Sequence, residues 1–106
     1  MNQNGYARRS SRVAARRLGD EVVIMSIENT AFLFSLNRVA ALIWEAADGM
    51  TSIEEISARI CSRFDVAPKA ALEDALDLVK RLAKHGILQM SDTPISAAND
   101  FVQESR

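Results

Sequence analysis

The sequence has few of the residue types that carry out chemistry. Its 106 residues include one cysteine, Cys61, and one histidine, His85. A disulfide framework needs paired cysteines and a structural zinc site needs several Cys or His ligands, so the sequence excludes both. Any nucleophilic site built on a histidine base would have to use His85. We therefore expect a binding protein and not an enzyme, with no cofactor and no metal.

Long hydrophobic runs are missing as well. No apolar segment approaches the roughly 20 residues that a helix needs to cross a bilayer. The N-terminal arginines are not followed by an apolar stretch, so this end does not have the pattern of a secretory signal. With 48% hydrophobic and 25% charged residues, the composition is typical of one globular domain. We expect a cytoplasmic protein that does not contact a membrane.

The net charge of −1 hides a segregation of charge along the chain. Residues 1–18 contain five arginines and no acidic residue, whereas residues 19–90 carry a net charge of −4 and residues 91–106 carry −2. A basic arm can mark a nucleic-acid or membrane contact, but it is more often a solvated chain end. Because residues 1–11 are polar and have no periodicity, we predict that they form a flexible basic arm.

Three short segments have the pattern of β-strands, at residues 13–18, 21–28 and 31–36. Gly19-Asp20 and Asn29-Thr30 separate them and are typical turn residues. In the third segment apolar residues alternate between two faces, as they do in a half-buried strand. The segments predict an antiparallel meander.

From Asn37 onward the hydrophobic period changes from two to about 3.6 residues, which indicates helices. Asn37 is a good N-cap, and Asp48-Gly49 is expected to end the first helix. Residues 51–54 have the spacing of a capping box that opens a second helix. Pro68 suits the first turn of a third helix, which Gly86 is expected to end. Residues 87–90 are suited to one more short strand.

These elements predict an α+β fold of the winged helix-turn-helix type, with a three-stranded antiparallel sheet followed by three helices. The domain is expected to cover residues 12–90 and to be followed by a polar tail at 91–106. A winged helix can also be a DNA-binding regulator. Here, however, the outer face of the third helix begins with Glu73, Asp74 and Asp77. Their charges would repel phosphates, so nucleic-acid binding is not favoured.

Several short motifs together resemble the PqqD-like family. They are Phe34-Ser35-Leu36-Asn37, Ile43-Trp44-Glu45, Asp48-Gly49, Ser52-Ile53-Glu54-Glu55-Ile56, Phe64-Asp65-Val66, Leu82 and Gly86-Ile87-Leu88. Each motif is weak alone, but their order and spacing are specific. The resemblance covers roughly residues 13–90. The resemblance implies a winged-helix RiPP recognition element, a peptide chaperone that binds the leader segment of a ribosomally made precursor peptide.

The resemblance also implies the partners. Such modules present the precursor to a separate maturation enzyme, for example a radical-SAM enzyme in pyrroloquinoline quinone synthesis or a leader peptidase in lasso peptide assembly, and catalyse nothing themselves. The peptide is expected as a fourth strand between the third strand and the third helix. Residues 31–36 fit this role independently, since a meander leaves its last strand at an edge and this one carries no charge or proline to block pairing.

The expected peptide-binding residues therefore lie on two elements. On the third strand they are Ala31, Phe32, Leu33, Phe34, Ser35 and Leu36, and on the third helix Ala71, Asp74, Ala75, Leu78, Arg81 and Leu82. Two interpretations of Leu78 stay open, as the floor of a peptide groove or as a residue packed against the sheet. Trp44 is expected in the core, with a contact to the enzyme as the alternative.

One more function stays open besides peptide and DNA binding. The free third strand can pair with the same strand of a second chain, which would make the protein a homodimerising interaction module.

Overall fold

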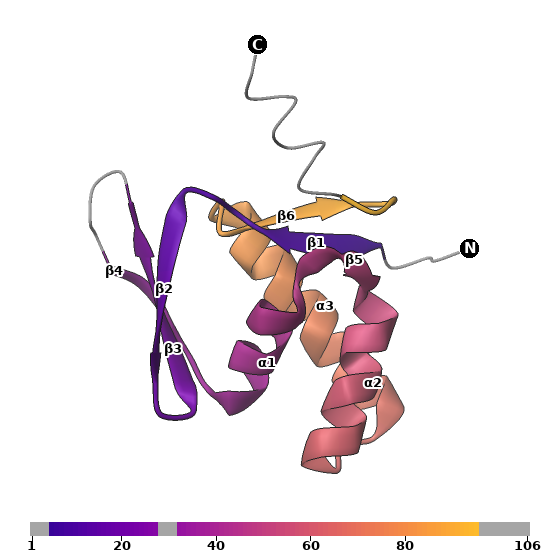
Figure 1. Ribbon diagram of the computed structural model, residues 1–106. Coiled ribbons are helices and arrows are strands. Elements are labelled where there is room, and N and C mark those ends of the chain that lie inside the picture. The colour runs from indigo at the N-terminus through magenta and orange to yellow at the C-terminus, as the bar shows by residue number, and fades with distance from the viewer. Residues whose placement is uncertain (1–4, 28–31, 96–106) are drawn as a thin grey trace.

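The computed structural model describes residues 5–27 and 32–95, which form three helices and six strands (Figure 1). In chain order the elements are β1 (Tyr6–Arg9), β2 (Val13–Leu18), β3 (Glu21–Ser26), β4 (Phe32–Leu36), α1 (Arg38–Ala46), β5 (Asp48–Ser52), α2 (Ile53–Phe64), α3 (Pro68–Lys84) and β6 (Leu88–Ser91). The α+β class and the three helices are confirmed. The strand count is not, because the strands form two sheets.

The first sheet is the predicted meander, in the order β2-β3-β4. Both strand pairs are antiparallel, and the β2–β3 hairpin runs in register from Val13 opposite Ser26 to Leu18 opposite Glu21. Strand β3 lies in the centre and buries Val22 and Ile24 at 2% and 0% exposure. The sheet stands to one side of the helices, with β4 leading directly into α1 (Figure 1).

The second sheet, in the order β5-β1-β6, was not predicted. Its central strand β1 is antiparallel to both neighbours, with Arg8 opposite Asp48 on one side and Gln89 on the other. The prediction of a flexible arm at residues 1–11 is therefore wrong for Tyr6–Arg9, while residues 1–4 lie outside the described part. The strand pairs through its main chain and fully buries only Ala7, so it leaves almost no hydrophobic pattern in the sequence.

Arg9 ties this strand to the end of α1. Its Nη1 donates hydrogen bonds to the carbonyl oxygens of Trp44 at 2.9 Å and Glu45 at 2.7 Å. The Arg9 backbone N–H donates to the carbonyl of Ala47 at 3.1 Å. Carbonyls in the last turn of a helix have no partner within the helix, and a cation there also interacts favourably with the helix dipole. A basic residue predicted to be solvated is thus part of the helix cap.

The helix ends follow local signals closely. Asn37 caps α1, its side chain accepting a hydrogen bond from the Ala40 N–H at 2.9 Å. The capping box of α2 consists of Ser52 and Glu55, one residue later than the predicted spacing. The shift follows from β5, which was not predicted and holds residues up to Ser52 in extended conformation. Pro68 opens α3 as expected.

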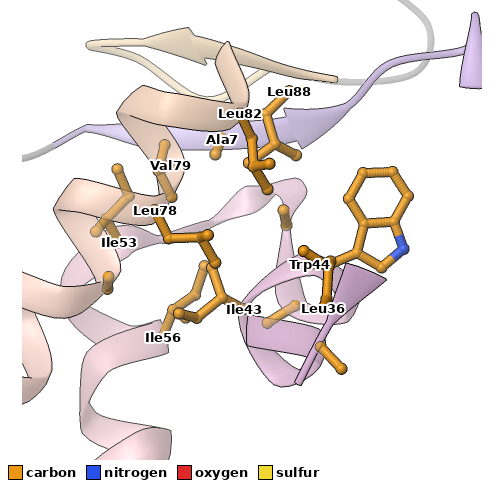
Figure 2. Close-up of a cluster of buried hydrophobic side chains, with 14 of the residues drawn as sticks. Ala7, Leu36, Ile43, Trp44, Ile53, Ile56, Leu78, Val79, Leu82 and Leu88 are labelled. Atoms are coloured by element: carbon orange, nitrogen blue, oxygen red, sulfur yellow. The ribbon is translucent and has the colours of Figure 1, made fainter. Parts of the chain in front are cut away.

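The core lies where the helices meet strands β1, β3 and β6. Figure 2 shows side chains from several of these elements pointing toward one another, among them Ala7, Ile43, Val79 and Leu82, all at most 1% exposed. Trp44 is 5% exposed, which confirms its expected place in the core.

The chain after β6 turns back over β5. Ile95 is 8% exposed, and its N–H donates to the carbonyl of Gly49 at 2.7 Å. Gly49 has a φ of +84°, and a Cβ built on it would lie 2.0 Å from the Ile95 carbonyl oxygen. Glycine is therefore required at this position for two reasons, its backbone conformation and the close approach of another backbone.

We predict that Gly49→Ala destabilises the protein more than Gly19→Ala does. Gly19 has a φ of +64° with nothing within 4 Å of an added Cβ, so its substitution costs only the left-handed conformation, about 1–2 kcal/mol. Gly49→Ala adds the clash with Ile95. Urea unfolding of both variants measures the difference, and equal losses would show that Ile95 does not pack on β5.

Candidate functional site

Strand β4 lies at the edge of its sheet, as predicted. It pairs with β3, and no strand in the described part of the chain pairs with its outer side. Its register shifts between Phe34, opposite Ile24, and Phe32, opposite Met25, so Leu33 has no direct partner on β3. Such irregularities bend a strand and are common at sheet edges. The outer edge of β4 is therefore free for pairing within the described residues, but the strand is irregular near its start.

The predicted strand residues differ in their surroundings. Leu36 is 2% exposed and belongs to the core, Phe34 is half-buried, and Ser35 is exposed. Ala31 lies outside the described residues, and Phe32 and Leu33 are described only as backbone. The Phe34 ring meets the His85 imidazole edge-to-face, with centroids 5.2 Å apart and planes at 65°. This contact joins β4 to the end of α3.

A hollow of about 370 Å³ opens between α1 and α3, close to the end of β4. We call it the α1–α3 hollow. Its lining comes from the cap and first turns of α1 and from the middle of α3, namely Asn37, Val39, Ala40, Ile43, Asp74, Asp77, Leu78 and Arg81. Asn37 immediately follows β4, so the strand edge leads into the hollow without an intervening loop.

The structure separates the predicted α3 residues into two groups. Asp74, Leu78 and Arg81 line the α1–α3 hollow. Three others are 0% exposed and lie in the core, where they hold α3 in place without facing the hollow; they are Ala71, Ala75 and Leu82. A helical wheel finds the apolar stripe of a helix, but it does not show which part of the stripe a neighbouring helix covers.

The contribution of α1 was missed. Val39, Ala40 and Ile43 supply the apolar wall of the hollow, whereas the predicted peptide-binding residues include none from this helix. The spacing i, i+4 of Val39 and Ile43 is the signal that could have found this wall, because it places both on one side of the helix that follows the open strand. Ile43 also belongs to the core, since it is 1% exposed.

Leu78 unites the two interpretations left open for it. It is 7% exposed and packs with the core cluster (Figure 2). Its remaining surface lines the hollow. Around this apolar floor stand the carboxylates of Asp74 and Asp77 and the guanidinium of Arg81. An aliphatic floor with a charged rim suits an apolar side chain from an extended peptide with polar neighbours.

Other kinds of site are not seen among residues 5–27 and 32–95. They contain no group of three or more His, Cys, Asp or Glu side chains placed to hold a metal ion. None of the helices in this part of the chain is long and apolar enough to span a membrane.

The sequence matches the model of one known protein family. The family model of coenzyme PQQ synthesis protein D (PqqD) matches residues 21–88, which run from β3 through the first residue of β6. A search of curated proteins found no match to this sequence.

A solved structure is also similar, described as "TbiB1 in Complex with the TbiA(beta) Leader Peptide". The similarity covers 77% of this chain and 94% of that chain, at 27% sequence identity and a TM-score of 0.69. The similar protein was thus solved with a leader peptide bound to it.

The two roles of Leu78 predict an asymmetry between variants of the hollow. Leu78→Ala should lower the free energy of unfolding by roughly 2–5 kcal/mol, because it leaves a cavity in the core. Asp74→Asn, at the exposed rim, should change it by no more than about 0.5 kcal/mol. Chemical denaturation measures the free energy of unfolding of both variants. If Leu78→Ala leaves this free energy unchanged, Leu78 only lines the hollow.

Proposed function

We propose that this chain, which belongs to the PqqD family, binds the leader segment of a ribosomally made precursor peptide. The observation that carries the proposal is the free edge of β4 running into the α1–α3 hollow. The similar structure supports it, since that protein is in complex with a leader peptide. We also propose that the domain is of the winged helix-turn-helix type, because its three helices pack beside antiparallel sheets.

The leader would bind as a further strand on β4. Main-chain hydrogen bonds to the strand edge fix its register, and alternate side chains point toward the helices. One apolar side chain then enters the α1–α3 hollow and rests on Val39, Ile43 and Leu78. Buried apolar anchors of this kind supply most of the binding energy of a peptide interface.

The role is that of a non-catalytic carrier. The groups that line the hollow are aliphatic at the floor and charged at the rim, which suits holding a peptide rather than attacking one. The reaction then belongs to a separate maturation enzyme, such as a radical-SAM enzyme or a leader peptidase. We place the protein in the cytoplasm, where a ribosomally made precursor is first available.

The charge of the α3 surface favours a peptide over DNA. Glu73, Asp74 and Asp77 are all exposed on α3, the helix that would enter the major groove in a DNA reader. Two of them stand at the rim of the α1–α3 hollow. Phosphates would be repelled there, whereas a leader with a basic residue beside its apolar anchor would be attracted.

Titration calorimetry with the leader of the precursor encoded nearest this chain tests the proposal directly. We expect saturable one-to-one binding, and no binding of a scrambled leader of the same composition. Absence of any heat at high micromolar concentration, in a protein with the expected helical content, would refute the proposed function.

A backbone variant tests the mode of binding. Leu33→Pro removes the N–H of the β4 residue that has no direct partner on β3, and it should abolish leader binding because register depends on main-chain hydrogen bonds. Leu33→Ala keeps that N–H and is the matched control. We expect both variants to retain the helical circular dichroism of the wild type. If Leu33→Pro binds as tightly as Leu33→Ala, the leader does not pair with β4.

A further inference from the structure

A second hollow lies on the other side of α1 from the first. Its volume is about 650 Å³, and its walls come from the β2–β3 turn, from α1 and from the second half of α2. The charged residues in these walls are four arginines and two acids, namely Arg17, Arg38, Arg59, Arg63, Asp20 and Glu45. We call it the arginine hollow. Three of these arginines come from residues 19–90, which are acidic overall, so the cluster does not follow from composition.

Two of the four arginines already have partners. Arg17 forms an ion pair with Glu45, and its Nη1 donates to the Gly19 carbonyl at 3.0 Å. The Arg38 guanidinium lies 5.4 Å from the centroid of the Phe64 ring, in a cation–π contact. These contacts fix the positions of two of the guanidinium groups in the walls of the hollow.

Arg59 and Arg63 have no such partner. Both are exposed, and neither forms an ion pair or hydrogen bond with any residue the structure describes. They stand at positions i and i+4 of α2, where like charges face each other and destabilise the helix. Two unpaired cations kept side by side in this way favour an anionic ligand.

The floor adds an apolar component. Leu42 and Phe64 are half-buried and line the hollow below the arginines. Guanidinium groups bind carboxylates in a planar two-bond geometry, and they also lie well on aromatic rings. The site therefore fits a protein segment with two or more carboxylates next to an apolar side chain.

We propose that the arginine hollow docks an acidic segment of the maturation enzyme, with its carboxylates on Arg59 and Arg63 and an apolar side chain on Leu42 and Phe64. This inference depends on the proposed leader-binding function. The two hollows lie on different sides of α1, with Val39 and Ile43 facing one and Leu42 and Glu45 facing the other. Leader and enzyme can then bind at the same time, as presentation of a peptide requires.

A double charge reversal, Arg59→Glu with Arg63→Glu, tests the docking. The probe is the purified maturation enzyme encoded beside the precursor, titrated against the chain saturated with leader. We expect the variant to bind the enzyme at least about tenfold more weakly, because repulsion replaces attraction. Its affinity for the leader should be unchanged. Added salt should weaken enzyme binding by the wild type.

The matched control is Arg16→Glu with Lys69→Glu, which changes the net charge equally at two exposed residues that line neither hollow. Equal weakening by both pairs would overturn the proposal in favour of general electrostatic attraction. Lower leader affinity in the Arg59/Arg63 variant would overturn it too, since the hollow would then take the leader.

Two more outcomes separate this inference from the proposed function. If the wild type binds the leader but not the enzyme, the docking site is refuted and the leader-binding function stands; if it does not bind the leader, the proposed function fails first. Sedimentation at several protein concentrations tests whether a second copy of the chain binds in the hollow. A wild-type dimer that the Arg59/Arg63 variant dissociates would assign the hollow to self-association and overturn the proposal.

Discussion

Strand β1 fixes the positions of the three helices through its main-chain pairing. Strand β5 connects α1 to α2, and β6 follows α3, so β1 pairs with the segments that adjoin all three helices. Arg9 adds hydrogen bonds to the last carbonyls of α1. The chain then continues from β1 into β2, which places the meander beside the helices. The distance between the β4 edge and α3 thus depends on four residues near the N-terminus (Figure 1).

Helix α1 divides the surface into two sites. It is only nine residues long, yet its buried side supports the core with Ala41, Ile43 and Trp44. Its remaining faces wall the α1–α3 hollow on one side and the arginine hollow on the other. Because one short helix serves both hollows, a ligand in one of them stands within a helix diameter of a ligand in the other, roughly 10–12 Å. This arrangement suits a carrier, which must hold one molecule close to another.

Much of the architecture could be predicted because its signals are local. The strand patterns at residues 13–18 and 21–28, the cap at Asn37 and the proline at Pro68 each depend on a few neighbouring residues. The structure has these elements close to where the patterns indicated, with β3 ending at Ser26. The free edge of β4 also followed from local order, since the last strand of a meander lies at an edge. Strands β1 and β5 could not be found this way. Their pairing is entirely long-range, and Asp48-Gly49 is typical of a turn.

The candidate site was predictable only where one element determines it. Phe34 and Ser35 lie on the free strand whatever packs beside it, whereas Ala71, Ala75 and Leu82 became core because α2 and the second sheet cover that side of α3. The contacts of the charged residues also could not be predicted from their positions in the sequence. Arg9 and Arg17 come from the basic N-terminal segment, where Arg9 caps α1 and Arg17 pairs with Glu45. Arg59 and Arg63 come from the acidic part of the chain and are unpaired within the described residues. Folding therefore gathers four arginines from both parts of the chain into one hollow, beside Asp20 and Glu45. The segregation of charge along the chain did not indicate where this hollow would lie.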